Sequence, residues 1–438
     1  MRQANAAAGW PFSLSGILET GMSSGALTEA VLIHFSGPDK PGLTAGITSI
    51  LAQYDVSMLD IGQAVVHETL ALGMLVQIPG GLSMVDFKAA LLDRAHELGL
   101  QARFKVVQQN AIKHWLHGLH HHHFIITLLG RSITAKQLAR VSAIIAGHGM
   151  NVDRIDRLSG LLSPGDIPAN ACVEFAVSGD ASRELSMRTA FLATAQELST
   201  DIAFQRESIF RRNRRLFAFD MDSTLIQGEV IDELAKMVGA GERVSRITEA
   251  AMRGELGFDE SFTRRVALLE GLPAERVHRL LDTIPLAEGA ERLIRTLKLL
   301  GYKTAILSGG FNFFARHLQE RLGIDYVYSN ELEMVDGKVT GRVVPPIING
   351  GRKAALLAEI AGREGISLEQ VVAVGDGAND IPMLNIAGMG IAYRAKPLVR
   401  QNAAQSISCL GLDGLLYLLG VRDRDLQPHE AQRASAWQ

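Results

Sequence analysis

Two carboxylates on alternate positions, Asp220 and Asp222, directly follow a short apolar run at residues 216–219. If that run is a buried strand, both side chains emerge at its carboxyl end, where open parallel sheets bind their ligands. One carboxylate could then attack phosphorus while the other moves protons, as in enzymes that form an aspartyl-phosphate. The alternative is an Asp-x-Asp pair that only caps the next helix, and residues further along the chain decide between the two.

Two features suited to binding an anion lie further along the chain. A second apolar run, residues 302–307, ends in Ser308-Gly309-Gly310, whose glycines let backbone N–H groups approach an anion while the hydroxyl adds a donor. Lys353 follows a Gly-Gly pair at the start of a helical pattern, where it could supply a positive charge. For such a lysine, a solvent-exposed position on the helix is the alternative.

A third apolar run, residues 371–374, ends in Gly375-Asp376-Gly377-Ala378-Asn379-Asp380. Hard cations prefer carboxylate and amide oxygens as ligands. This loop therefore predicts a metal site at the end of a third strand.

These motifs, in this order, resemble the haloacid dehalogenase superfamily of phosphatases over residues 214–420. The sequences Glu229-Val-Ile-Asp-Glu-Leu-Ala and Ser308-Gly-Gly-Phe are similar to those of superfamily members that hydrolyse phosphoserine. The resemblance implies an α/β fold, a Rossmann-like parallel sheet with a helical cap insertion. It also implies magnesium-dependent hydrolysis of O-phospho-L-serine to L-serine and phosphate, the final step of serine biosynthesis.

The resemblance assigns roles around the first motif. Asp220 attacks phosphorus, and Asp222 protonates the departing seryl oxygen and then activates water. Mg²⁺ is held by the carboxylates of Asp220 and Asp376 and by the backbone carbonyl of Asp222. Cations are needed because two like unit charges about 4 Å apart repel by roughly 4 kcal/mol at an effective dielectric of about 20. Lys353 and the metal ion would let an anionic nucleophile approach a phosphate dianion.

Further residues are implied to hold the substrate. Ser308 and the N–H of Gly309 bind the phosphoryl oxygens, and Lys353 screens their charge. Asn379 forms a hydrogen bond near the phosphate or the substrate. We expect Asp380 behind these groups, where it orients Lys353 or a metal-bound water.

An insertion at about residues 227–288 is typical of a helical cap, with helices expected at residues 229–238, 244–253, 259–269 and 275–281. A cap over a strand-end site excludes water during transfer. It offers Glu229 for the ammonium of phosphoserine and Arg265 for the carboxylate. The alternatives are a first-turn helix acid and a solvated helix face. Met252 and Phe258 could shield the substrate or belong to the cap core.

About two hundred residues precede these motifs. Strands are expected at residues 30–35, 57–66, 70–78 and 102–107, and helices at residues 43–54 and 84–98, which is a ferredoxin-like order. The loop Gly37-Pro-Asp-Lys-Pro-Gly42 resembles ACT domains, which often bind amino acids. Residues 124–129, 135–148, 151–157 and 171–178 predict a second copy. The expected organisation is a flexible start (1–27), ACT-like domains (28–110 and 122–205), a phosphatase domain (210–421) and a flexible tail (422–438).

The two ACT-like copies predict a separable N-terminal half. Their sheet edges and faces are commonly buried by pairing between chains, so we expect a homodimer. A chain that starts near Glu207 is expected to keep its chemistry, because every proposed site residue follows it. Whether the copies bind an amino-acid effector or serve only for dimerisation is left open by the sequence.

Composition narrows the remaining possibilities. A formal net charge of −3 argues against nucleic-acid binding, and two cysteines argue against a disulfide framework or a zinc site. No apolar run is long enough for a membrane span, so no membrane partner and a cytoplasmic location are expected. The run His120 to His123 is interpreted as a domain junction, because four adjacent histidines cannot all face one ion and no acidic partner lies nearby in the sequence.

Two other functions stay open at this point. A phosphotransferase would pass the phosphoryl group from the aspartate to an alcohol such as homoserine instead of water. An amino-acid-sensing regulatory protein would use the phosphatase domain only as a scaffold, although the intact set of Asp220, Asp222, Lys353 and Asp376 argues against it.

Overall fold

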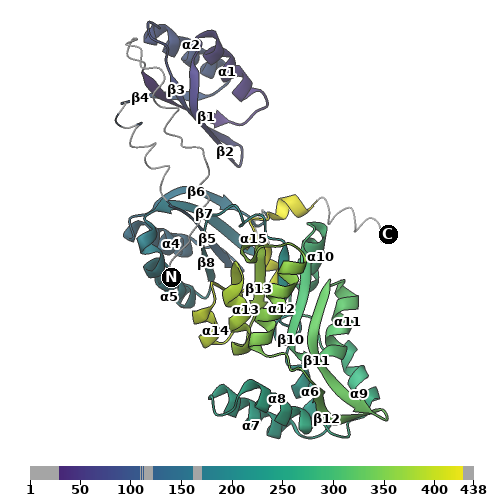
Figure 1. Cartoon of the computed structure of the whole chain (residues 1–438). Helices are drawn as coiled ribbons and strands as arrows, with labels where there is room; N and C mark the ends of the chain where they lie inside the picture. The colour runs from purple at the N-terminus through teal and green to yellow at the C-terminus, as the bar shows by residue number, and fades with distance from the viewer. Residues whose placement is uncertain (1–28, 109, 111, 113–121, 161–169, 428–438) are drawn as a thin grey trace, which may run out of the picture. The chain divides into compact units, whose positions relative to one another are not determined.

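The computed structural model describes residues 29–108, 110, 112, 122–160 and 170–427. The chain divides into two compact units, Met1–His120 and His121–Gln438, which are described separately below (Figure 1). The expected flexible segment 1–27 and most of the expected tail lie outside the described residues. No helix in the described part of the chain is long and apolar enough to cross a membrane.

The first unit contains one ferredoxin-like module, here called the first module. Its elements follow the predicted order: β1 (Ala30–Pro38), α1 (Leu43–Gln53), β2 (Ser57–Val66), β3 (Thr69–Gln77), α2 (Met84–Glu97) and β4 (Gln101–Val107). The antiparallel sheet has the order β2-β3-β1-β4. Alternate residues of β1 and β3 pack on α1 and α2 in a single core, as the strand period of two requires. In contrast, β2 is an edge strand that is exposed along its whole length.

The second module repeats this arrangement at the start of the second unit. Its elements are β5 (His122–Gly130), α4 (Ala135–Gly147), β6 (Asn151–Arg157), β7 (Ala171–Gly179), α5 (Glu184–Leu198) and β8 (Asp201–Arg206). The sheet order β6-β7-β5-β8 corresponds strand for strand to the first module. The second domain was expected to extend to residue 205, but the predicted elements ended at residue 178 and did not include α5 and β8, which complete the repeat.

The remaining chain folds around a seven-stranded sheet and is here called the parallel-sheet domain. Its strand order is β12-β11-β10-β9-β13-β14-β15, parallel throughout except for β12 at one edge. The strands are β9 (Leu216–Phe219), β10 (Lys303–Phe311), β11 (Tyr326–Val335), β12 (Lys338–Val344), β13 (Val371–Gly375), β14 (Met389–Tyr393) and β15 (Gln405–Ile407). The predicted Rossmann-like sheet is confirmed, with β9 at its centre.

Helices cover both faces of this sheet. On β9, Phe217 and Phe219 pack in the core with α10 (Ala290–Leu299) and α11 (Asn312–Leu322), whereas Leu216 and Ala218 face the opposite core. That second core contains α12 (Gly350–Arg363), α13 (Ile381–Ile386) and α14 (Pro397–Asn402). Because both faces are buried there, the central strands β9 and β13 are continuously apolar, and the polar motif residues follow their ends.

The predicted cap is present between β9 and α10 (Figure 1). It consists of α6 (Val230–Met237), α7 (Gly241–Met252), α8 (Phe258–Ala267) and α9 (Ala274–Arg279). The two connections to the sheet lie side by side, since Ile226 pairs with Leu286 and the Ala287 N–H donates to the Leu225 carbonyl at 2.8 Å. This paired connection is the place from which the cap extends over the sheet.

The second module shares its core with the parallel-sheet domain. Leu129 and Cys172 of the second module belong to the same buried cluster as the residues around β9. At the adjoining sheet edges, the Gln405 side chain accepts from the Phe204 N–H at 2.9 Å and donates to the Phe204 carbonyl at 2.8 Å. A buried ion pair joins Glu174 of β7 to Arg211. The expectation of two modules in one separable N-terminal half is therefore wrong for the second module.

The start of the expected flexible tail is also part of this core. Asp423 accepts hydrogen bonds from the Gly160 N–H at 2.8 Å and from the Tyr417 hydroxyl at 2.9 Å, and Leu426 is buried. Residues 422–427 are thus held by side-chain contacts, contrary to the prediction.

The histidine run coincides with the boundary between the two units. His120 lies outside the described residues, and His122 and His123 open β5. The interpretation as a junction is confirmed. The expectation that no acidic partner lies near these histidines holds only along the sequence. In the fold, the Asp153 carboxylate lies 3.8 Å from His123 Nδ1 across the sheet.

Candidate active site

The central strands bring the predicted motifs to one edge of the sheet. Asp220 follows β9, Ser308 lies in β10, and Asp376 follows β13, and these three strands are parallel neighbours. The Asp220 N–H donates to the Val374 carbonyl at 2.9 Å, which fixes the two motif segments against each other. All three side chains are buried. The expected constellation at the carboxyl end of the sheet is therefore assembled.

Lys353 reaches this edge from the opposite direction, on the first turn of α12. Its Nζ lies 2.7 Å from a carboxylate oxygen of Asp220 and 2.7 Å from one of Asp380. Burial alone would lower the pKa of this lysine, but the two carboxylates outweigh that effect and raise the pKa above its usual value. Lys353 is thus a permanent buried cation, and the solvent-exposed alternative is excluded.

Three buried carboxylates, those of Asp220, Asp376 and Asp380, have oxygens that lie within 4.8 Å of one another. Burial first, and then repulsion from Asp380, raises the pKa of Asp220 to about 7. Burial first, and then repulsion from Asp220, raises the pKa of Asp376 to about 8. Carboxylates so crowded are stabilised in their charged form by a nearby cation. The oxygen donors therefore fit a hard divalent ion such as Mg²⁺.

Asp380 has a separate task within this group. One of its oxygens accepts from the N–H groups of Asp376 at 3.1 Å and Gly377 at 2.9 Å, and the other binds Lys353. Both oxygens are engaged, so Asp380 holds the loop and the lysine in place, in agreement with the expected orienting role.

Asp222 occupies a different environment from Asp220, although only one residue separates them. Its Oδ1 accepts from the Val230 N–H at 2.9 Å, at the start of α6. Burial, followed by the charges of Glu229 and Asp220, raises its pKa well above the usual value. A carboxyl group in these surroundings retains its proton at a pH at which an exposed aspartate is ionised. The two carboxyl groups are therefore chemically distinct.

The Ser308-Gly-Gly segment does not lie beyond the end of its strand, as the sequence led us to expect, because β10 continues through Phe311. The strand changes register between Leu307 and Phe311, so the two glycines lie within an irregular part of the strand. Ser308 is fully buried, and its Oγ accepts from the Gly310 N–H at 2.9 Å. A side chain at Gly310 would collide with the Asp222 carboxylate. Glycine is therefore required here by close packing and not by a turn.

The cap places Glu229 and Arg265 next to the same edge. Glu229 precedes α6, where its carboxylate accepts from the Ser223 hydroxyl at 3.2 Å. Burial raises the pKa of Glu229 and lowers that of Arg265, and in both cases the charge of the other residue opposes the shift. The Nε of Arg265 is buried without a hydrogen-bond partner among the described residues. The cap thus places the Glu229 carboxylate and the Arg265 guanidinium next to the site, and the guanidinium has an N–H donor that is not yet used.

The structure shows fewer contacts for two other predicted residues, Phe258 and Asn379. Phe258, at the start of α8, lies so close to Gly309 that an added Cβ there would be 2.8 Å from its ring. Asn379 lies in the metal-ligand loop and is partly exposed. Its contact with phosphate or substrate stays a prediction, as does any role of the Met252 side chain, which lies outside the described part of the structure.

One buried residue that sequence reasoning missed connects the elements of the site. The Asn330 side chain, on β11, donates to the Gly309 carbonyl at 2.8 Å and accepts from the Ile348 N–H at 2.7 Å. It therefore ties the Ser308-Gly-Gly segment to the residues just before α12. The sequence contains no signal for it, because a single asparagine at a strand position is indistinguishable from an exposed one.

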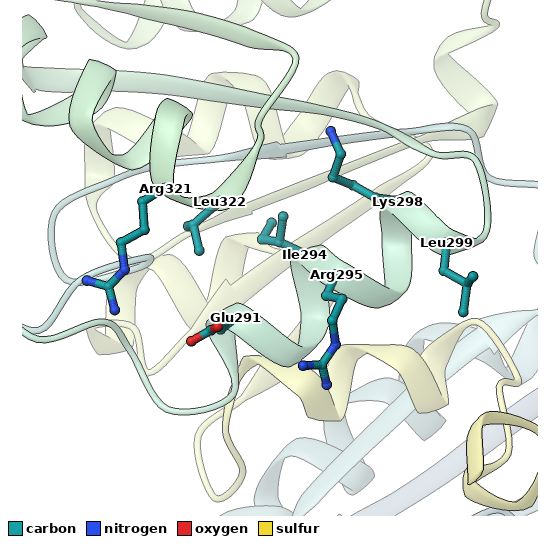
Figure 2. A pocket seen from close by; sticks show the side chains of 7 residues that line it. All are labelled: Glu291, Ile294, Arg295, Lys298, Leu299, Arg321 and Leu322. Atoms are coloured by element: carbon teal, nitrogen blue, oxygen red, sulfur yellow. The ribbon is translucent and has the colours of Figure 1, made fainter. Parts of the chain in front are cut away.

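One described pocket lies elsewhere on the parallel-sheet domain and contains none of the predicted site residues. It has a volume of about 410 Å³ and is formed by α10 and the end of α11, with Ile294, Arg295, Lys298, Arg321 and Leu322 among its lining residues. Figure 2 shows Lys298 directed away from Arg295 and Arg321. The charged side chains are exposed, as is usual on helix surfaces.

Comparison with known families agrees with this architecture. The sequence matches the haloacid dehalogenase-like hydrolase family over residues 217–385 and ACT domain families over residues 29–105 and 121–205. A phosphoserine phosphatase of Streptomyces coelicolor is 42% identical over 398 residues, which cover 91% of this chain and 93% of that protein. A phosphoserine phosphatase of Mycobacterium tuberculosis is 40% identical over 412 residues, which cover 92% of this chain and 96% of that protein.

Solved structures give the same result. A crystal structure of a haloacid dehalogenase family hydrolase from Salmonella enterica aligns with a TM-score of 0.59 and 30% identity, covering 67% of this chain and 98% of that one. A crystal structure of a probable phosphoserine phosphatase from Vibrio cholerae aligns with a TM-score of 0.54 and 32% identity, covering 68% of this chain and 86% of that one.

Proposed function

Because this chain belongs to the phosphoserine phosphatase family of haloacid dehalogenase-like hydrolases, we propose that it hydrolyses O-phospho-L-serine to L-serine and phosphate through a phosphorylated Asp220. One observation carries the proposal. Two buried carboxyl groups lie at the end of β9, of which Asp220 contacts a permanent cation and Asp222 has a raised pKa. A nucleophile and a proton donor are thus placed side by side.

In the first half of the reaction, a carboxylate oxygen of Asp220 attacks phosphorus. Lys353 reduces the repulsion between this carboxylate and the phosphate dianion, since its charged Nζ already lies 2.7 Å from Asp220. Ser308 and the N–H of Gly309 hold the phosphoryl oxygens. The protonated Asp222 donates to the seryl oxygen as the P–O bond breaks.

In the second half, the same Asp222, now ionised, takes a proton from the water that attacks the phospho-aspartate. Phosphate leaves and Asp220 is regenerated. General acid–base help of this kind contributes typically about 10²- to 10⁴-fold. The raised pKa of Asp222 supports both steps, because a group that holds its proton more tightly than usual is also a better base after losing it.

The metal ion belongs to this proposal as well. Mg²⁺ held by the carboxylates of Asp220 and Asp376 and by the Asp222 carbonyl would neutralise charge and align the phosphate for in-line attack. Two neighbours keep the carboxylates of Asp220 and Asp376 in place. Asp380 holds Lys353, which contacts Asp220, and the Thr224 hydroxyl donates to Asp376 at 3.2 Å.

Substrate specificity is assigned to the cap. Arg265 pairs with the carboxylate of phosphoserine and Glu229 with its ammonium, while Phe258 covers the phosphoryl group beside Gly309 and Asn379 adds a hydrogen bond. The unused Nε of Arg265 supports this assignment, because a buried donor without a partner is costly and is satisfied by a bound carboxylate.

The ACT domains are assigned a separate role. We propose a homodimer in which β2 of the first module is covered by a second copy. This edge strand exposes Met58, Leu59, Ile61, Val65 and Val66, and such an apolar edge is unfavourable when left uncovered. We propose an amino acid as the effector of these domains. We also propose that the protein is cytoplasmic and catalyses the final step of serine biosynthesis.

Phosphate release from a panel of phosphorylated small molecules, with and without Mg²⁺, tests the function. We expect phosphoserine to be the preferred substrate, no turnover with chelator, and less than about 0.1% of the rate in Asp220→Asn, whose amide cannot attack phosphorus. Homoserine added as an acceptor distinguishes a phosphotransferase, which would form a new phosphate ester. Preference for a phosphate ester without an amino-acid group would overturn the proposal.

A further inference from the structure

Helix α8 of the cap is anchored firmly at its C-terminal end. The loop after it forms backbone hydrogen bonds with β12, from Gly271 N–H to the Val339 carbonyl and from Val339 N–H to the Leu272 carbonyl, each 2.9 Å long. Midway along the helix, the Phe262 ring lies 5.8 Å from that of Phe311 in β10. These contacts leave the N-terminal end of α8 as the part that can move relative to the site.

Among the residues that the structure describes, one polar contact joins that N-terminal end to the parallel-sheet domain. The Asn349 Nδ2 donates to both carboxylate oxygens of Asp259, at 3.1 and 3.2 Å, across a sequence separation of 90 residues. The neighbouring Phe258 lies over Gly309. The contact therefore lies next to Gly309 of the site, between the cap and the start of α12.

Asn349 is also the N-cap of α12. Its Oδ1 accepts from the Arg352 N–H at 3.1 Å, and its backbone carbonyl accepts from the Lys353 N–H at 2.9 Å. The acceptor end of the amide thus holds the helix that carries Lys353, and the donor end holds the helix that carries Arg265. One side chain links the phosphate-binding and the carboxylate-binding halves of the site.

We propose that Asn349 and Asp259 form a latch that holds the cap closed, and that both act as positioning residues for catalysis. The latch keeps Arg265 and Phe258 over the bound substrate and excludes water while the phosphoryl group is transferred. Its effect on turnover rests on the proposed function. Its effect on cap closure does not, because the contact joins two side chains of this chain.

Reciprocal substitutions test the latch. Asn349→Asp places a second carboxylate against Asp259, yet Asp remains a good N-cap for α12, so the helix that carries Lys353 is retained. Asp259→Asn removes the charge from the contact. In the double variant, the amide at position 259 donates to the carboxylate at position 349, which rebuilds the contact with the roles exchanged. Glu260→Gln is the matched control, because Glu260 pairs with Arg264 in the same turn.

Two measurements report whether the contact between Asn349 and Asp259 is formed. In the free enzyme, amide hydrogen exchange in the first turn of α8 is expected to rise in Asn349→Asp, to stay unchanged in Glu260→Gln and to return to the wild-type level in the double variant. The KM for phosphoserine is expected to rise about 10-fold in Asn349→Asp, the lower end of the range for losing a hydrogen bond to a charged group, because the contact is exposed. It is expected to recover in the double variant.

The outcomes separate the latch from the function. Unchanged exchange in Asn349→Asp, or a double variant as impaired as the single ones, would overturn the latch. If phosphoserine is not a substrate but exchange follows the expected pattern, the latch stands and the proposed function fails. Equal loss in thermal stability and activity without recovery would assign Asn349 to the helix cap alone.

Discussion

At the residue scale, Asp220 and Asp222 illustrate how surroundings assign roles to chemically identical groups. Lys353 contacts Asp220 and favours its charged form, against the burial that raises its pKa to about 7, and Asp220 also shares with Asp376 a group of carboxylates that fits a divalent cation. Asp222 lies against Glu229 at the start of α6, and its pKa is raised well above the usual value. Enzymes commonly separate an acid from a nucleophile in this way. The sequence predicted both residues and these neighbours as members of one site, but not the contacts that distinguish the two carboxyl groups.

The raised pKa of Asp222 predicts a pH dependence. Because Asp222 donates its proton to the seryl oxygen, the kcat/KM for phosphoserine should fall as pH rises through that pKa and the carboxyl group ionises. In Asp222→Asn this decline should disappear, with an overall loss of about 10²- to 10⁴-fold. p-Nitrophenyl phosphate, whose leaving group needs no proton, should show a smaller loss. An unchanged decline in the variant would assign it to another group.

Arg265 gives a second prediction at this scale. Arg265→Ala should lower kcat/KM for phosphoserine by about 10- to 150-fold, equivalent to roughly 1.5–3 kcal/mol for a charge-assisted hydrogen bond. Phosphoethanolamine, which lacks the carboxylate, should be affected much less. The neighbouring Arg264 pairs with Glu260 at the surface, so Arg264→Ala is the control and should change neither substrate. Equal losses on both substrates would show that Arg265 is structural.

At the element scale, the sequence indicated that the segments of Asp220, Ser308 and Asp376 lie at one edge of the sheet, because each follows an apolar run that is long enough to be read as a strand. It could not place the contacts between elements. Asn330 joins β10 to the segment before α12, and Asn349 joins α12 to α8, each across a long sequence separation. Such bonds depend on the assembled fold, and no local pattern indicates them.

The irregular end of β10 predicts the effect of a minimal substitution. A Cβ at position 310 would meet Asp222, the Met221 Cε at 2.8 Å and the Ser308 Oγ at 3.1 Å. Gly310→Ala should therefore displace the acid and the phosphate donor and reduce kcat at least about 10²-fold, as expected for losing acid catalysis. Gly362→Ala, near the end of α12 with no atom within 4 Å, is the control. Wild-type kcat in Gly310→Ala would show that this close packing does not position Asp222.

At the scale of the whole molecule, the second ACT domain is part of the structure that supports the active site. Asp201 and Gln205 of β8 are buried because they bond to the parallel-sheet domain, Asp201 accepting from the Ser408 N–H at 2.9 Å and Gln205 donating to the Leu418 carbonyl at 3.1 Å. These polar residues interrupt the apolar pattern, which is why β8 was missed. A buried polar residue facing another domain cannot be distinguished from an exposed one in a sequence.

Two truncations test this organisation. A chain starting at residue 121 should fold and keep its activity, because the first module is a separate compact unit. A chain starting at residue 207 should be strongly destabilised, since it exposes part of the shared core and leaves Arg211 without Glu174. Loss of one partner from a buried ion pair alone costs about 3–5 kcal/mol. Thermal unfolding and phosphatase assays on both chains check this, and a stable, active chain from residue 207 would contradict it.

The most direct test of the account is to locate the phosphoryl group during turnover. The enzyme is mixed with phosphoserine labelled at phosphorus, in the presence of Mg²⁺, quenched in acid within a turnover and digested, and the labelled peptide is sequenced by mass spectrometry. We expect one acid-stable, base-labile acyl phosphate, on Asp220, and none in Asp220→Asn. Release of labelled phosphate with no labelled Asp220 at any time, or with the label on another residue, would contradict it.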